Sequence, residues 1–75
     1  MRVTLRYFAV LRELRGTERE EIELPEGATA GEAYRRSGCP VDLPVGFAVN
    51  ATFVKAGEPL ADGDELAFLP PLGGG

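Results

Sequence analysis

Hydrophobic and polar residues alternate in three segments of the chain with the two-residue period of a half-buried β-strand. These segments are residues 2–8, 19–27 and 65–69. Successive side chains of a strand point to opposite faces of a sheet, so one set of residues in each segment is expected to form the core. That set is Val3, Leu5, Tyr7, Ile22, Leu24, Leu66 and Phe68. A fourth apolar segment, residues 47–55, is predicted to be strand-like with a kink or turn near Asn50.

A short helix is predicted over residues 9–16, directly after the first strand. Val10, Leu11 and Leu14 have the spacing of one apolar stripe. Gly16 is a plausible end, because glycine adopts the left-handed conformation that closes many helices.

A second helix is predicted over residues 29–38. Thr29 and Glu32 have the spacing of a capping box, in which each side chain accepts a hydrogen bond from the other residue's backbone N–H. Gly38 fits its left-handed end. The residues expected to face the sheet are Ala30, Ala33 and Tyr34.

The order of these elements predicts an α+β protein of the β-grasp, or ubiquitin-like, class. We expect a mixed sheet of about four to five strands packed on one main helix, with a short helix beside it. The first and last strands are expected to pair in parallel at the centre, with the second helix in the crossover between them. One domain over residues 1–69 is then followed by an extended tail, residues 70–75.

Composition excludes several classes of binding site and of catalytic site. The net charge is −4, which argues against a general affinity for nucleic acid. The chain has one cysteine, Cys39, and no histidine, so an internal disulfide, a four-cysteine cluster and histidine-dependent catalysis or zinc binding are excluded. No apolar run approaches the roughly 20 residues that span a membrane, and the N-terminus does not resemble a signal peptide, so we expect a cytoplasmic protein.

The last eight residues, FLPPLGGG, carry no charged side chain. Pro70 and Pro71 favour an extended path, which would project the tail away from the domain. The three glycines that follow Leu72 can pass through a channel too narrow for other residues; they are Gly73, Gly74 and Gly75. A carboxylate on such a thread reacts only after activation, for example as an acyl-adenylate. An amine would then give a conjugate, and a sulfide donor a thiocarboxylate.

Three segments resemble the MoaD family, the small subunits of molybdopterin synthase. They are VTLRYFAVLRELRGT (3–17), AVNATFV (48–54) and LADGDELAFLPPLGGG (60–75), in the family's order. Residues 29–46 are the least specific part of the likeness. The resemblance implies a sulfur carrier that binds no cofactor and is not a catalyst alone, although it belongs to a sulfurtransferase complex.

The family mechanism, carried over, makes Gly75 the reactive residue and Gly74 its pair. A MoeB-type enzyme would adenylate Gly75 with ATP, and a sulfur relay would convert it to a thiocarboxylate. The tail would then enter a MoaE-type large subunit and donate sulfur to cyclic pyranopterin monophosphate, forming the dithiolene of molybdopterin. The implied assembly is a heterotetramer with two copies of the carrier.

Strand alternation places Phe8, Ala67 and Leu69 on the face opposite the core, beside the start of the tail. Exposed apolar patches mark partner surfaces. The family's contacts with the large subunit match Phe8, Arg12, Phe53 and Leu69, although many relatives have an aromatic residue in place of Leu69. The alternative for Phe8 or Phe53 is that the ring tucks under a loop.

Other functions share the tail chemistry. The chain is also compatible with a sulfur carrier for thiamine synthesis or tRNA thiolation, a protein modifier conjugated through Gly75, or a binding module with an incidental tail. Cys39 is expected to be a partly buried, inert thiol, and Asp62, Asp64 and Glu65 to shape a turn rather than bind a metal. Lys55, the only lysine, receives no role.

Overall fold

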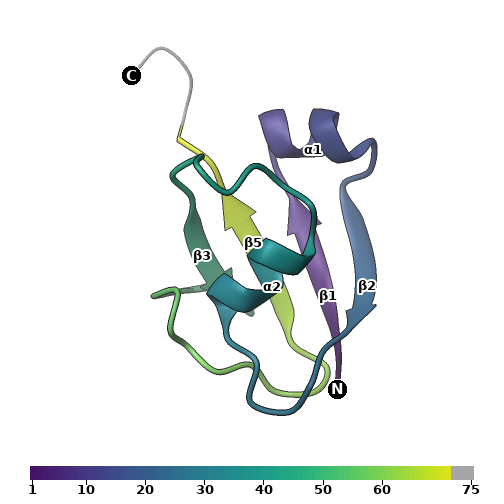
Figure 1. Cartoon of the computed structure of the whole chain (residues 1–75), viewed down its shortest axis with the longest axis vertical. Helices are drawn as coiled ribbons and strands as arrows, with labels where there is room; N and C mark the ends of the chain where they lie inside the picture. The colour runs from purple at the N-terminus through teal and green to yellow at the C-terminus, as the bar shows by residue number, and fades with distance from the viewer. Residues whose placement is uncertain (72–75) are drawn as a thin grey trace.

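The computed structural model describes residues 1–71, which form five strands and two helices (Figure 1). All five strands belong to one mixed sheet in the order β2-β1-β5-β3-β4. The strands are β1 (Arg2–Tyr7), β2 (Arg19–Glu23), β3 (Gly46–Val49), β4 (Thr52–Val54) and β5 (Glu65–Leu69). The helices are α1 (Val10–Arg15) and α2 (Ala30–Arg36).

The centre of the sheet is the parallel pair of β1 and β5. Leu5 lies opposite Leu66, and Tyr7 lies opposite Phe68. All other strand pairs are antiparallel. The parallel pair and the single main helix are the β-grasp arrangement, so the predicted fold class is confirmed.

The core lies between the inner face of the sheet and α2, which crosses that face in Figure 1. Phe68 is fully buried at its centre, with the rings of Tyr34, Tyr7 and Phe47 at centroid distances of 5.0, 5.9 and 5.9 Å. Three of these four aromatic residues come from strands and one from α2. The aromatic cluster therefore joins the two layers.

The start and end of α2 follow from local sequence. The capping box of Thr29 and Glu32 is present in both directions, as predicted, and Gly38 has the left-handed φ of 84° just beyond the helix. Ala30, Ala33 and Tyr34 are all buried. The prediction for this helix is confirmed.

Only one residue of the apolar stripe predicted for α1 is buried. Leu11 is fully buried, but Val10 and Leu14 are 43% and 58% exposed. The helix has only six residues and lies beyond the end of the sheet in Figure 1, so Leu11 alone of the three packs in the core. Its end is as predicted, with Gly16 at φ 73°.

The predicted strand region 47–55 is a hairpin of two strands. Asn50 and Ala51 have φ values of 48° and 71°, the pair of left-handed residues that a tight hairpin turn requires. The chain reverses there, so Phe53 of β4 lies opposite Ala48 of β3. The second predicted strand is also shorter than expected, because β2 ends at Glu23, before Pro25.

The two edge strands are both poor templates for further pairing. β2 carries four charged residues among its five: Arg19, Glu20, Glu21 and Glu23. β4, at the other edge, is three residues long. Charge and short length are two of the ways in which natural sheets protect their edges.

Two phenylalanines allow burial to be tested with one matched substitution. Phe68→Ala removes a fully buried ring and is expected to lower the free energy of unfolding by about 3–5 kcal/mol. Phe53→Ala removes a ring that is 80% exposed and is expected to change it by less than about 0.5 kcal/mol. Urea unfolding followed by circular dichroism measures both, and equal losses would contradict this assignment of the core.

Candidate functional site

The outer face of the sheet, opposite α2, carries most of the residues predicted to meet a partner. One row of side chains crosses all five strands on this face. In sheet order the row is Arg19, Arg6, Ala67, Ala48 and Phe53. It therefore begins with two arginines and ends with three apolar residues.

A second set of apolar residues lies nearer the ends of β1 and β5. Leu69 is opposite Gly46, and Phe8 follows Tyr7, whose partner Phe68 precedes Leu69. Phe8 therefore extends the same face beside Leu69. We call the five residues Phe8, Ala48, Phe53, Ala67 and Leu69 the apolar patch.

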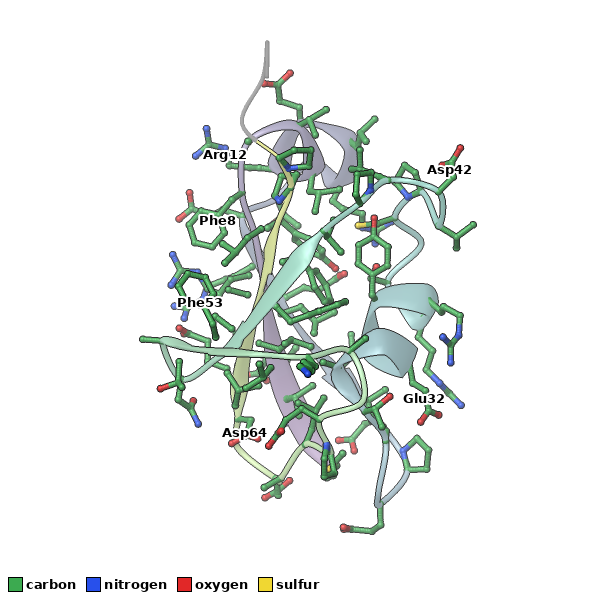
Figure 2. The ribbon with its side chains drawn as sticks, turned by 90° about the vertical axis from the view of Figure 1, so that its left-hand side faces the viewer. Phe8, Arg12, Glu32, Asp42, Phe53 and Asp64 are labelled. Atoms are coloured by element: carbon green, nitrogen blue, oxygen red, sulfur yellow. The ribbon has the colours of Figure 1, made fainter. Side chains whose placement is uncertain are left out.

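Phe8, Ala67 and Leu69 have the facing that strand alternation predicted, and strand pairing adds Phe53 and the buried Ala48 to the same face. Leu66 and Phe68 are fully buried, and the intervening Ala67 and Leu69 are only partly buried. Phe8 is 37% exposed, and Phe53 lies on the same side of the molecule, as Figure 2 shows. Arg12 of α1 is exposed and also points to this side (Figure 2). That these residues contact a partner stays a prediction.

The described part of the chain ends next to this patch. Pro70, expected as the first residue of the tail, is buried, and Pro71 is exposed. Leu72, Gly73, Gly74 and Gly75 lie outside the described residues. Because β1 and β5 are parallel, the chain leaves β5 at the same end of the sheet where Phe8 follows β1.

A strained residue follows Phe8. Ala9, the N-cap of α1, has φ 51° and ψ −126°, a region that a residue with a Cβ rarely adopts. The turn is closed by hydrogen bonds from the Leu11 N–H to the Phe8 carbonyl at 3.0 Å and from the Arg12 N–H to the Ala9 carbonyl at 3.1 Å. Sequence reasoning missed this strain, since alanine carries no signal for it. The turn fixes where Phe8 and Arg12 lie.

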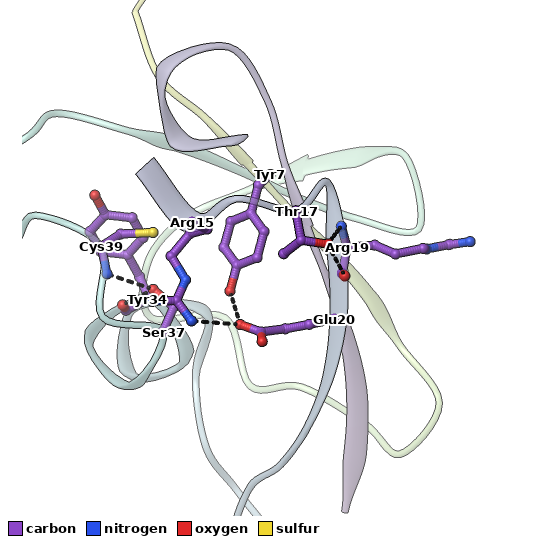
Figure 3. Close-up of polar contacts among 8 residues, drawn as sticks. All are labelled: Tyr7, Arg15, Thr17, Arg19, Glu20, Tyr34, Ser37 and Cys39. Carbon is purple, nitrogen blue, oxygen red and sulfur yellow. Dashed lines mark hydrogen bonds and ion pairs between the residues drawn. The ribbon is translucent and has the colours of Figure 1, made fainter. Parts of the chain in front are cut away.

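A polar cluster anchors α1 to β2 (Figure 3). The Tyr7 hydroxyl donates to Oε1 of Glu20 at 2.5 Å, and Arg15 donates to the same oxygen at 3.2 Å. The Arg15 guanidinium also lies over the Tyr7 ring, 5.9 Å from its centroid. Burial, together with the Glu20 carboxylate, raises the pKa of Tyr7 well above its usual range, so the hydroxyl stays a donor. Sequence reasoning gave Arg15 and Glu20 no role.

Cys39 lies in a second polar cluster, also drawn in Figure 3, beyond the end of α2. Its backbone N–H donates to the Ser37 hydroxyl at 3.2 Å, and the Tyr34 hydroxyl donates to the Pro40 carbonyl at 2.6 Å. The Cys39 side chain is buried, with 4% of the residue exposed. It is therefore more deeply buried than the sequence suggested.

Asp62 and Asp64 hold the turn before β5, as predicted, whereas Glu65 is the first residue of β5 and pairs with Arg6 and Arg19. Asp64 accepts hydrogen bonds from the Ala61 N–H at 2.8 Å and from the Asn50 side-chain amide at 3.0 Å. Asp62 accepts one from the Arg2 N–H at 2.7 Å. Their oxygens thus fix the approach of the chain to β5.

The surface formed by residues 1–71 contains no pocket and no cluster of three potential metal ligands among its cysteine, aspartate and glutamate side chains. Neither helix in this range is long and apolar enough to cross a membrane. The candidate site is therefore an open surface beside the end of β5.

The sequence is similar to one protein family and to two proteins of the same name. The model of the ThiS family matches residues 5–75. The molybdopterin synthase sulfur carrier subunit of Escherichia coli is 38% identical over 76 residues, covering 92% of this chain and 94% of that protein. The protein of the same name from Chlamydomonas reinhardtii is 35% identical over 83 residues, with 100% of both chains covered.

Two solved structures are also similar over 100% of both chains. One is SAMP1 from Haloferax volcanii, with a TM-score of 0.82 and 27% identity. The other, with a TM-score of 0.68 and 26% identity, belongs to a complex of subunits 1 and 2 of the molybdopterin-converting factor from Helicobacter pylori.

The strain at Ala9 gives a testable expectation. Glycine adopts this conformation without a steric penalty, so Ala9→Gly is expected to raise the free energy of unfolding by about 1 kcal/mol. The control is Ala61→Gly, at an exposed alanine without a positive φ, where glycine is expected to lower stability by about 0.5 kcal/mol. Urea unfolding compares the two, and a loss of stability in both variants would rule out strain at Ala9.

Proposed function

The chain belongs to the ThiS family, and we propose that it is the sulfur carrier subunit of a molybdopterin synthase. The observation that carries the proposal is the position of the apolar patch, at the end of the sheet where β5 leads into the tail. A partner that covers the patch also receives the C-terminal residues. The names and full-length identity of the relatives from Escherichia coli and Chlamydomonas reinhardtii support the choice of pathway.

In this proposal Gly75 is the reactive residue. A MoeB-type enzyme transfers AMP from ATP to its carboxylate, and pyrophosphate leaves. Sulfide, supplied by a donor relay, displaces AMP and gives a thiocarboxylate. The thiocarboxylate sulfur then attacks a carbon of cyclic pyranopterin monophosphate, where the new carbon–sulfur bond forms as a carbon–oxygen bond breaks and the oxygen takes the electron pair. Water cleaves the resulting acyl–sulfur bond. The sulfur stays on the pterin product and the Gly75 carboxylate is regenerated.

The terminal residues serve this route through their shape. In this proposal a partner holds a narrow segment of the tail, Leu72, Gly73 and Gly74, by its backbone. The preceding Pro70 and Pro71 favour an extended path that directs this segment away from the domain. Each carrier delivers one sulfur atom, and a dithiolene holds two. A heterotetramer with two carriers at the ends of a large-subunit dimer is consistent with this count.

The partner in the proposal is a MoaE-type large subunit that docks on Phe8, Arg12, Phe53, Ala67 and Leu69. The similar structure from Helicobacter pylori, in which subunit 1 is in complex with subunit 2, supports a large-subunit partner. The carrier binds no cofactor and performs no catalysis alone. Its carboxyl terminus is consumed and restored within the sulfurtransferase complex.

A second candidate function is that of a protein modifier joined to lysine side chains through Gly75. It is favoured by the likeness to SAMP1 and by a second Haloferax volcanii structure, small archaeal modifier protein 1, at a TM-score of 0.82 and 26% identity. Both functions begin with the same acyl-adenylate. They differ in whether sulfide or an amine attacks it.

Intact-protein mass spectrometry tests the carrier chemistry directly. After incubation with a MoeB-type enzyme, ATP and sulfide, the chain is expected to gain the mass difference between sulfur and oxygen. Deleting Gly75 is expected to abolish the gain without changing the thermal unfolding midpoint. An unmodified mass, with the enzyme active on another carrier, would contradict the proposal, and isopeptide-linked products in place of the thiocarboxylate would favour the modifier.

Binding tests the choice of partner. Phe8→Glu places a charge in the docking surface and is expected to weaken binding to the purified large subunit by at least about ten-fold. Isothermal titration calorimetry measures the affinity, and the control is Val41→Glu, at a residue that is 75% exposed in the loop after α2. Unchanged affinity would remove Phe8 from the interface, and binding to a thiazole synthase instead would indicate thiamine synthesis.

A further inference from the structure

Arg6 lies beside the apolar patch, on the same outer face, although it is charged. Arg6 lies directly opposite Ala67 on the outer face, and Phe8, the residue after the end of β1, continues that face. The Arg6 guanidinium carbon is 5.2 Å from the centroid of the Phe8 ring, within the range of a cation–π contact. Its side chain is 33% exposed. A partner that covers both Phe8 and Ala67 therefore also covers Arg6.

The charge of Arg6 is only weakly neutralised by its own chain. Its ion-pair partner among the described residues is Glu65, at 3.4 Å. The other oxygen of the same carboxylate is held more tightly by Arg19, at 2.8 Å. Two guanidinium groups thus share one carboxylate, and Arg6 has the longer and weaker contact. This part of the outer face carries a local positive charge, on a protein whose net charge is −4.

Covering such a group with another protein has a definite electrostatic consequence. In the free chain, water solvates the exposed part of the guanidinium. A partner that removes this water leaves the Arg6 charge paired only with Glu65, whose carboxylate is shared with Arg19. Burying a charge without a full ion-pair partner is strongly unfavourable. An arginine presents a planar fork of donors, which a carboxylate fits with two hydrogen bonds.

We propose that the large-subunit surface that docks on the apolar patch carries an aspartate or glutamate that pairs with Arg6. This inference rests on the proposed function, and it adds a second charged element of specificity, besides Arg12, to a surface that is mostly apolar. The partner surface it describes is an apolar area with a carboxylate placed between the positions that receive Phe8 and Ala67. Glu65, whose other carboxylate oxygen pairs with Arg19, and the Phe8 ring hold Arg6 in place for this contact.

Arg6→Leu tests the proposal because the alternatives predict opposite signs. If a partner carboxylate faces Arg6, leucine leaves that carboxylate buried and unpaired, and binding to the purified large subunit weakens by about thirty-fold or more. If none does, leucine removes the desolvation of a charge from an apolar interface, and binding is unchanged or tighter. A loss below about five-fold, which is the contribution of a solvent-exposed ion pair, would also overturn the proposal.

The controls separate folding, general charge and the identity of the partner. Arg36→Leu makes the same change at an exposed arginine of α2, on the other side of the sheet, and is expected to leave the affinity unchanged. Arg6→Lys keeps the charge without the fork and is expected to fall between the natural chain and Arg6→Leu. Thermal unfolding of each variant checks its fold. Absence of binding by the natural chain would count against the proposed function, whereas normal binding by Arg6→Leu would overturn only the role of Arg6.

Discussion

The parallel pairing of β1 with β5 is the constraint on which the rest of the structure depends. These strands come from opposite ends of the sequence, and their pairing closes the sheet around α2. Parallel strands require a long crossover, and here the chain between them contains the helix that covers the core. The same pairing brings Phe8 and the end of β5 to one end of the sheet. The fold and the candidate site therefore have a common origin.

Alternation within single strands separates stability from recognition. In β5, Leu66 and Phe68 point into the core, and Ala67 and Leu69 face outward. At the end of β1, Tyr7 is buried, while Arg6 before it and Phe8 just after the strand lie on the outer surface. Neighbouring residues therefore contribute separately to core packing and to the outer surface, because a two-residue period places their side chains on opposite faces. Such a surface can change while the core is retained.

Strand alternation and helix caps made much of this structure predictable. The two-residue period located β1 and β5 and gave the correct facing of Phe8, Ala67 and Leu69, and the Thr29–Glu32 pair located the start of α2. The exposure of Val10 and Leu14 was not predictable in this way, because helical spacing does not show whether a short helix reaches the core.

Other features depend on neighbours that are distant in sequence. The sequence indicated a kink or turn near Asn50, but the turn at Asn50 and Ala51 is left-handed without a glycine, so the full reversal that orients Phe53 was not predicted. The place of Arg6 depends on its neighbours in β5 and β2, which only the sheet brings together. The strain at Ala9 likewise arises from how α1 joins β1.

The guarded edges of the sheet determine how the molecule can associate with other proteins. With β2 highly charged and β4 only three residues long, an incoming chain finds little backbone on which to add a strand. Association must then proceed through side chains of the outer face, whose contacts form and separate without rearranging the sheet. In the proposed function the chain meets one partner to be loaded and another to be emptied, and this exchange requires such reversibility. Edges that resist backbone pairing also protect a small, repeatedly exposed domain from aggregation.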